Sequence, residues 1–337
     1  RLHEGASRGY VPPHSADWQT APDGVDVLLG RDLIQPHYPT FDKEVSTALH
    51  IRRAGDISGQ QLGQYMLETM RPLGAQFQQA KVVGLAKADR FAVEVLADGV
   101  RQTIRADIIV NAAGPFAAQV AAMHGERLPI VNVLQQKIAF ADRNRAVDRK
   151  MPFAIDLDGQ TLAWSDDERA ELAAAPEFAR LLAPMPGSIH CRPDGGDHGE
   201  WIKLGWAFNE EQITAPVREP ELNSYFPEVV LRAASRLQPR LAQYLAALPR
   251  DRVHYGGYYP MTKENWPLIG AAKTPGVFLA TALSGYGTMG ACATGDLCAC
   301  AVVGAPVPAF ARSLSLARYD DKALMDQLAA SESRGLL

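Results

Sequence analysis

The sequence has little of three things: long apolar runs, clustered charge of one sign, and cysteine. No uncharged apolar stretch approaches the roughly 18 residues that a membrane span needs. The richest candidate, residues 291–304, contains Asp296 and is expected to form a buried helix. The 34 Lys and Arg residues are balanced by 38 Asp and Glu residues, for a net charge of -4, and no Lys/Arg run suggests a basic groove. We therefore expect neither a membrane span nor a nucleic-acid partner.

The 4 cysteines offer no obvious metal site or redox pair. Cys298 and Cys300 are two residues apart in an expected helix, so their side chains diverge. We interpret them as buried free thiols, which fits a reducing cytosol and predicts a cytoplasmic protein without a bound metal. The chain opens at Arg1 with neither Met nor a charged-then-apolar leader, so no signal peptide is expected.

What the sequence does have is an ordinary globular composition that changes character along the chain. Its 337 residues are 47% hydrophobic and 21% charged, enough for a large core and two structural units. Residues 1 to about 50 are rich in Pro, Gly and polar groups, with short apolar pieces such as residues 25–29. We interpret this first stretch as loop and short helix.

Residues 58–114 have clear helix and strand signals. Ser58 can cap a helix that carries one apolar face and ends at Gly74. A strand is expected at residues 81–85, and a hairpin follows with its turn at Asp98-Gly99. Residues 108–110 are apolar on both faces, as in a buried central strand, and lead into Asn-Ala-Ala-Gly-Pro.

From about residue 134 to 257 the pattern changes to scattered strands with long insertions. Strands are expected near residues 136–140, 188–192 and 202–208. One helix is expected over residues 227–245, with an apolar stripe and with Pro239 kinking or dividing it.

A glycine-rich turn lies near the C-terminus. Residues 285–290 match G-x-G-x-x-G, directly after an expected strand at residues 277–282 and before a small-residue helix that runs through Val303. The motif alone suggests a dinucleotide site, but no second strand ending in an acid follows the helix. Tight packing of strand on helix is a second interpretation. We favour a third, in which the helix N-terminus faces an anionic or electron-rich ligand.

Several blocks resemble the D-amino-acid oxidase (DAO) superfamily of FAD-dependent oxidoreductases, which includes glycine and sarcosine oxidases. The C-terminal blocks are Tyr-Tyr-Pro-Met-Thr at residues 258–262, Trp-Pro-Leu-Ile-Gly at 266–270, the strand at 276–280, and Ser-Gly-Tyr-Gly at 284–287. Upstream, Gly-Asp-Ile at residues 55–57 and the strand that ends in Asn-Ala-Ala-Gly at 107–114 agree with the family in order and spacing.

The resemblance implies an α/β (α+β overall) fold, in which a partial, doubly wound FAD-binding domain is interrupted by an antiparallel-sheet substrate domain. We assign residues 1–54 to an irregular part of the substrate domain and residues 55–133 to the FAD-binding domain. Residues 134–256 form the rest of the substrate domain, and residues 257–337 complete the FAD-binding domain. Family members begin with a strand, G-x-G-x-x-G and a helix, and we expect this chain to lack that segment.

By resemblance, the adenine lies near Val82 and Val83, the phosphates near the Asn-Ala-Ala-Gly turn, and the isoalloxazine near the glycine-rich turn. The full set of expected FAD-contacting residues is Val82, Val83, Ala112, Ala113, Gly114, Gly257, Ser284, Gly285, Gly287, Thr288 and Met289. Backbone N–H groups at the start of the last helix would stabilise negative charge on the reduced flavin.

Three departures from the family pattern refine these expectations. Gly257 stands where sarcosine oxidases carry the Cys that attaches FAD, so non-covalent FAD is expected. Met289 stands where those enzymes carry a Lys that assists the reaction with oxygen, which leaves oxygen and another electron acceptor both open. Tyr259 stands where glycine oxidase-like members carry an Arg for the substrate carboxylate, so it can offer a hydrogen bond but no charge.

The implied reaction is hydride transfer from a C–H beside an amine to flavin N5, followed by imine hydrolysis. Tyr259 and Tyr286 are the candidate substrate-orienting groups, with aromatic packing as the alternative. Lys137 is a candidate carboxylate ligand or a solvated strand residue. Arg192, which shares a strand face with His190, is a candidate carboxylate fork or a structural ion-pair partner.

Three classes of function follow from the sequence. The first is an FAD-dependent amine or amino-acid oxidoreductase with a small-molecule substrate, an unidentified electron acceptor and a possible homo-oligomeric state. The second is a truncated or degenerate, non-catalytic member of the family. The third is an NAD-dependent dehydrogenase that uses the turn at Gly285.

Overall fold

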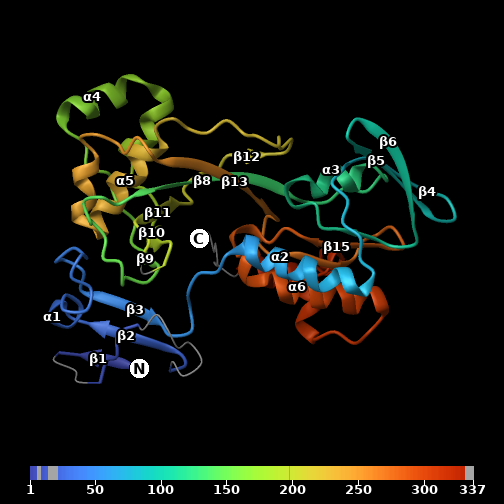
Figure 1. Cartoon of the computed structure of the whole chain (residues 1–337), viewed down its shortest axis with the longest axis horizontal. Helices are drawn as coiled ribbons and strands as arrows, with labels where there is room; N and C mark the ends of the chain where they lie inside the picture. The colour runs from blue at the N-terminus through green and yellow to red at the C-terminus, as the bar shows by residue number, and fades with distance from the viewer. Residues whose placement is uncertain (6–8, 14–21, 197, 331–337) are drawn as a thin grey trace. The chain divides into compact units, whose positions relative to one another are not determined.

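The computed structural model describes residues 1–5, 9–13, 22–196 and 198–330 (Figure 1). Helices and mainly antiparallel sheets are mixed along the chain, which confirms the expected α/β (α+β) class. The chain divides into two compact units. Unit 1 consists of residues 1–57, 135–208 and 221–256, and unit 2 consists of residues 58–134, 209–220 and 257–337.

The first part of unit 1 is a small three-stranded sheet. Its strands are β1 (Leu2–Glu4), β2 (Val25–Leu29) and β3 (Thr47–Ile51), and the short helix α1 (Arg31–Ile34) follows β2. β1 and β2 are parallel, whereas β2 and β3 are antiparallel. The expectation of loop and short helix was wrong here. Each strand is short and pairs with a segment distant in sequence, so local patterns do not reveal the sheet.

Most of a six-stranded sheet lies in unit 1, while residues 131–134, 212–213 and 257–261 of its strands are assigned to unit 2. Its strands are β8 (Val131–Ala141), β9 (Ala154–Asp156), β10 (Ile189–Asp194), β11 (Trp201–Trp206), β12 (Gln212–Ile213) and β13 (Val253–Met261). Their order is β12-β8-β11-β10-β9, and β13 also pairs with β8. The strands expected near residues 136–140, 188–192 and 202–208 are confirmed as β8, β10 and β11. Residues 135–141 of β8 belong to unit 1.

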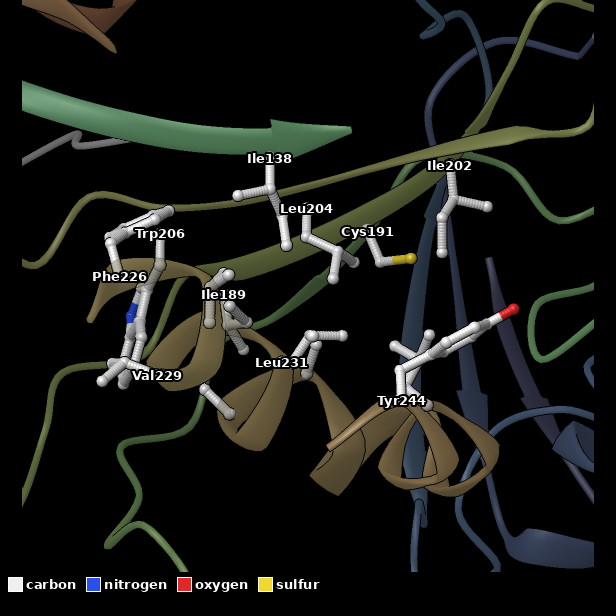
Figure 2. Close-up of a cluster of buried hydrophobic side chains, with 14 of the residues drawn as sticks. Ile138, Ile189, Cys191, Ile202, Leu204, Trp206, Phe226, Val229, Leu231 and Tyr244 are labelled. Atoms are coloured by element: carbon white, nitrogen blue, oxygen red, sulfur yellow. The ribbon is translucent and has the colours of Figure 1, made fainter. Parts of the chain in front are cut away.

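The two faces of this sheet differ in character because successive side chains of a strand point to opposite faces. On one face Ile138, Ile189 and Leu204 contribute to a hydrophobic core with helix α5 (Phe226–Leu237), as Figure 2 shows. The opposite face carries the alternate residues of the same strands. That face is polar and is described with the candidate active site.

Helix α5 ends where the sequence predicted a break. Val230, Ala233, Ala234 and Leu237 are all buried, as their helical spacing indicated. Pro239 starts a separate 3-10 helix, η4 (Pro239–Tyr244), because proline cannot continue the hydrogen-bond ladder of α5. The remaining helices of unit 1 are α4 (Asp166–Ala174) and the 3-10 helix η3 (Pro176–Leu182).

Unit 2 begins with a helix and a hairpin sheet. Its first elements are α2 (Gly59–Met70), the 3-10 helix η1 (Arg71–Leu73), β4 (Lys81–Lys87), β5 (Phe91–Ala97) and β6 (Val100–Ala106). The Ser58 hydroxyl accepts a hydrogen bond from the Gln61 N–H and so caps α2, as expected. The turn between β5 and β6 uses left-handed backbone at Asp98 and Gly99, with φ of 49° and 78°, which confirms the predicted hairpin.

A second three-stranded sheet of unit 2 has the order β14-β15-β7. Its strands are β7 (Ile109–Asn111), β14 (Leu268–Ala271) and β15 (Val277–Thr281). β7 is parallel to β15 and pairs with no other strand in the described part of the chain. Ile108 and Val110 are 44% and 47% exposed. The expectation of a buried central strand was therefore wrong, because no described element covers these side chains.

The rest of unit 2 is helical. It consists of the 3-10 helices η2 (Gly114–Phe116), η5 (Ser284–Tyr286), η6 (Ala309–Leu314) and η7 (Leu316–Asp320), and of α3 (Ala117–Ala122), α6 (Gly287–Val303) and α7 (Lys322–Ala330). α6 is the expected small-residue helix, but it buries only Thr294, Leu297 and Cys298, and Cys300 is half-buried. The expectation of a buried helix was wrong for its other face, where Val303 is 76% exposed. Among the described helices, none has the length and apolar content that crossing a membrane requires.

Candidate active site

Two turns of unit 2 lie side by side because the strands before them are parallel neighbours. Val277 pairs with Ile109 and Leu279 with Asn111, so β15 and β7 end at the same edge of their sheet. Each strand continues through a 3-10 turn into a helix, β7 into η2 and α3, and β15 into η5 and α6. Turns at the carboxyl ends of adjacent parallel strands are the usual ligand site of such sheets.

The turn after β15 combines unfavourable backbone with unsatisfied polar atoms. Ala282 and Ser284 have φ of 60° and 51°, a left-handed conformation that costs roughly 1–2 kcal/mol for a residue with a Cβ. The Thr281 and Ser284 hydroxyl oxygens are buried and have no hydrogen-bond partner within the described residues. Backbone strain and unmet hydrogen bonds concentrate at functional sites, and hydroxyls of this kind suit a polar ligand.

The turn after β7 is held by its own asparagine. The Asn111 side chain is buried, donates from Nδ2 to the Ala117 carbonyl at 2.9 Å, and accepts from the Ala113 N–H at 3.3 Å. Gly114 has a φ of 53°, and no described atom lies within 4 Å of the position its Cβ would occupy. A ligand can therefore approach the backbone closely at this turn.

Helix α6 starts at the second turn with its first N–H groups uncapped. No described side chain caps this 17-residue helix, and no described atom lies within 4 Å of the position that a Cβ of Gly287 would occupy. Gly285 and Tyr286 are half-buried, whereas Thr288 and Met289 are exposed. Uncapped N–H groups and the helix dipole favour negative charge at this point. The described residues after α6 form η6, η7 and α7 and no strand, which argues against an NAD site that would need one.

The other expected FAD-contacting residues lie elsewhere in unit 2. Val82 and Val83 are half-buried in β4, which belongs to the hairpin sheet. Gly257 and Tyr259 lie in β13. Gly257 is exposed with no described atom within 4 Å of its Cβ position, and Tyr259 is half-buried. Val277 of β15 packs with the β4–β5 hairpin in one hydrophobic cluster, which links the two sheets of this unit.

The turn that follows β13 is fixed by a buried ion pair that the sequence did not suggest. The Arg318 guanidinium is fully buried and donates to the Glu264 carboxylate from Nε at 2.8 Å and from Nη2 at 2.5 Å. It also donates to the Pro267 and Trp266 carbonyls. The Thr262 hydroxyl spans the same turn by donating to the Trp266 carbonyl. Arg318 therefore positions the segment that leaves the strand carrying Tyr259.

The polar face of the six-stranded sheet brings together charged side chains of unit 1. Strand register places His190, Gly205 and Lys137 in one row across β10, β11 and β8. The next row contains Arg192 and Lys203. The candidate ligands Lys137 and Arg192 thus lie in neighbouring rows of one sheet face.

Arg192 is already paired. Its Nη1 lies 3.0 Å from Asp56 and 2.9 Å from Asp194. Lys203 lies 3.1 Å from the second oxygen of Asp194. By contrast, no ion pair or hydrogen bond of the Lys137 ammonium is present among the described residues.

Burial shapes the titration of His190 and Lys137. Burial lowers the pKa of His190 to about 4, and the positive charge of Lys137 adds to this effect. The imidazole is therefore neutral near pH 7, and the contact of its Nδ1 with the Ser188 carbonyl at 3.3 Å requires the proton on Nδ1. Burial also lowers the pKa of Lys137, and the charges of Arg192 and Lys203 act in the same direction.

Gly205 makes room for this arrangement. A Cβ there would overlap the His190 ring and would lie 3.0 Å from Cγ of Lys137. We expect Gly205→Ala to lower the free energy of unfolding by about 1–3 kcal/mol, because the buried ring must move. Gly257→Ala is the matched control in another strand, where the new methyl meets no described atom within 4 Å. Urea denaturation measures both, and equal stabilities would contradict the prediction.

Several residues at or near the candidate site were not predicted from the sequence, and only some of them belong to a recognisable local pattern. Thr281 is the polar end of an apolar strand just before the glycine-rich turn, a pattern that could have been noticed. Arg318 and Glu264 are 54 residues apart, and Asp56 and Arg192 are 136 apart, so no local pattern relates them. Within the described ranges, no group of three or more His, Cys, Asp or Glu side chains is arranged to hold a metal ion.

A family profile described as "DAO: FAD dependent oxidoreductase" matches residues 4–301. D-amino acid dehydrogenase 3 of Mesorhizobium japonicum is 27% identical over 218 residues. The match covers 64% of this chain and 42% of that protein, so the chain spans less than half the length of this relative.

Solved structures with a similar fold include two oxidases and a dehydrogenase. Glycine oxidase from Geobacillus kaustophilus has a TM-score of 0.63 at 16% identity, with 88% of this chain and 67% of that chain covered. L-proline dehydrogenase from P. horikoshii has a TM-score of 0.61 at 16% identity, with 88% and 69% covered. Iminodiacetate oxidase from Chelativorans sp. BNC1 has a TM-score of 0.55 at 21% identity, with 85% and 65% covered. At these identities the likeness concerns the fold.

Proposed function

The chain belongs to the DAO family of FAD-dependent oxidoreductases, and from this membership we propose that it oxidises a C–N bond of an amine or amino acid with FAD. The observation that supports FAD binding most directly is the pair of turns at the ends of β7 and β15. They combine buried hydroxyls at Thr281 and Ser284, which have no partner among the described residues, with open backbone at Gly114 and Gly287. These features fit a large, polar cofactor that approaches the backbone.

In this proposal each part of unit 2 holds a different part of FAD. Val82 and Val83 line the adenine, and the backbone of residues 112–114 receives the phosphates. The glycine-rich turn, from Ser284 to Met289, receives the isoalloxazine, and the uncapped start of α6 stabilises its negative charge. Gly257 offers no thiol, so the cofactor is bound non-covalently.

When bound, FAD supplies the two-electron acceptor that takes a hydride from the carbon beside the amine. The protein's own part is to orient the substrate and to keep its amine unprotonated. Tyr259 and Tyr286, both half-buried in unit 2, are the proposed orienting side chains. Neither residue needs to act as a strong base for this chemistry.

The visible spectrum of the purified protein tests the proposal. We expect flavin absorption bands that survive gel filtration after incubation with FAD, that are released by acid, and that are bleached anaerobically by an amine or amino acid. Protein that neither retains FAD nor changes the FAD spectrum would overturn the proposal. If no amine or amino acid bleaches the bands, the protein binds flavin but the proposed oxidation is contradicted.

The two hydroxyls give a sharper test of where FAD binds. We expect Thr281→Val and Ser284→Ala each to weaken FAD binding about two- to tenfold, the loss that follows when one neutral hydrogen bond is removed. Thr294→Val is the control, because Thr294 is a buried threonine of α6 that lies beyond the turn. Fluorescence titration with FAD measures all three. Unchanged affinity in the first two variants would place the cofactor elsewhere.

A further inference from the structure

We propose that the side-chain oxygen of Asn132 accepts a hydrogen bond from the ribityl chain of FAD, the polyol that joins the flavin ring to the phosphates. This inference rests on the proposed function, because it adds a cofactor-binding residue to the same site. All the residues that carry it lie in unit 2, where Asn132 and Val133 at the start of β8 pair with β12. Asn132 is not among the FAD-contacting residues expected from the sequence.

The side chain of Asn132 lies against the turn that follows β7. It is 2% exposed, and its Nδ2 donates to the Pro115 carbonyl at 3.1 Å. This contact fixes the orientation of the amide, because an amide oxygen in the same place would meet a second acceptor. Oδ1 of Asn132 is therefore the end of the amide that is left for another partner.

That oxygen is buried and has no hydrogen-bond partner among the residues that the structure describes. A buried amide oxygen without a donor destabilises a fold, so such atoms call for a partner. Asn111, the buried asparagine that holds the same turn, differs from Asn132 in this respect. Its nitrogen donates to the Ala117 carbonyl and its oxygen accepts from the Ala113 N–H. The hydrogen bonds of Asn111 are satisfied within the turn, whereas those of Asn132 are not.

The groups around the two turns select the chemistry of the ligand. An amide oxygen only accepts hydrogen bonds, so the partner of Asn132 must be a donor. A phosphate at neutral pH offers mainly acceptors and would repel this oxygen. The Thr281 and Ser284 hydroxyls, which also have no partner in the described part of the chain, can donate or accept. A polyol provides donors and acceptors together, and FAD contains two such groups, the ribityl chain and the ribose.

The order of groups along FAD favours the ribityl chain. In the proposed function the phosphates meet residues 112–114 and the isoalloxazine meets residues 284–289, so the ribityl chain connects the first turn to the second. Strand pairing sets Leu279 opposite Asn111, which brings the ends of β15 and β7 together. The ribose lies on the other side of the phosphates, toward the adenine. We therefore expect a ribityl hydroxyl, and not a ribose hydroxyl, beside Pro115 and Asn132.

Binding of FAD analogues that each lack one ribityl hydroxyl tests the inference. Fluorescence titration gives the dissociation constants of FAD and of each analogue for the unmodified protein and for Asn132→Leu. We expect Asn132→Leu to bind FAD about two- to tenfold more weakly, because one neutral hydrogen bond is lost. One analogue should bind the unmodified protein more weakly by a similar factor. The same analogue and FAD should bind Asn132→Leu equally well, because the contact is already absent.

Asn111→Leu is the matched control, because it replaces a buried asparagine of the same turn whose hydrogen bonds are complete. A purely structural change of the turn should weaken FAD and every analogue by the same factor, and we expect this result for Asn111→Leu. Circular dichroism shows whether each variant folds. The comparison of FAD with its analogues on the unmodified protein requires no variant, so it remains decisive if Asn132→Leu does not fold.

The possible outcomes separate this inference from the proposed function. An unmodified protein that binds no FAD contradicts the proposed function itself. If FAD binds and every ribityl analogue binds as tightly as FAD, only the role of Asn132 is contradicted. The same holds if the loss caused by the missing hydroxyl is undiminished in Asn132→Leu. If only FAD with deoxyadenosine in place of adenosine shows a loss that depends on Asn132, the partner is the ribose, and the assignment to the ribityl chain is wrong.

Discussion

Replacing Arg318 by Met is expected to lower the free energy of unfolding by about 3–5 kcal/mol, because it leaves the Glu264 carboxylate buried without its cation. The two side chains are 0% and 4% exposed, so water cannot take over the lost contacts. The Pro267 and Trp266 carbonyls would also lose their donor. The expected loss exceeds that of an ordinary surface substitution several-fold.

Urea denaturation followed by tryptophan fluorescence measures this loss, since Trp266 lies in the clamped turn. Arg312→Met is the control, because Arg312 pairs with Asp321 but is 72% exposed, and such pairs contribute less than about 1 kcal/mol. The double variant Arg318→Met, Glu264→Leu should recover much of the stability, because it removes both charges. If Arg318→Met is as stable as Arg312→Met, the pair does not hold the turn.

The second large effect is a loss of stability between about pH 6.5 and pH 4 that comes from His190. The pKa of its imidazole falls from 6.5 to about 4 in the folded protein. Above pH 6.5 the ring is neutral in both the folded and the unfolded protein. His190 then makes its full contribution to the free energy of unfolding. As the pH drops, the unfolded chain takes up the proton first, so unfolding is favoured progressively until the folded pKa is reached. A gap of about 2.5 pH units corresponds to about 3 kcal/mol.

His190→Asn isolates this contribution from the other groups that titrate in the same range. The amide can still donate to the Ser188 carbonyl but takes up no proton. Denaturation at several pH values should give a difference between the two proteins that changes by about 3 kcal/mol over this range. If the two proteins lose stability in parallel as the pH falls, His190 takes up its proton over the same pH range in the folded and the unfolded state. Burial and the nearby Lys137 ammonium would then not lower its pKa.

Local signals in the sequence predicted individual elements well. The Ser58 cap, the Asp98-Gly99 turn, the break at Pro239 and the helix after the glycine-rich turn all depend on residues within a few positions of one another. Short-range steric and hydrogen-bonding rules decide such features, so no knowledge of the fold is needed. The family blocks were likewise visible as ordered motifs.

Elements that depend on distant partners were predicted poorly. The sheet of residues 2–4, 25–29 and 47–51 was missed because pairing, and not composition, makes its strands. The apolar strand at residues 109–111 was expected to be buried on both faces. Apolar character alone does not reveal that β7 is an edge strand in the described part of the chain.

For the candidate site, the sequence by itself determined which residue types were available and in which segments. It indicated two turns rich in small residues, two tyrosines, and the cations Lys137 and Arg192, each in an expected strand. Each of these follows from spacing along one strand or turn, which the chain specifies locally. The sequence left open whether Lys137 or Arg192 was the better carboxylate ligand.

Only the tertiary structure shows which acids these two cations meet. Strand register brings Asp56 and Asp194 to Arg192 and leaves Lys137 without an acid among the described residues. Register also brings β7 beside β15, where the Thr281 and Ser284 hydroxyls have no hydrogen-bond partner in the part of the chain that the structure describes. Which charges meet and which stay unmet depends on the order of strands in a sheet. That order is fixed by the packing of the whole core and not by any local pattern in the chain.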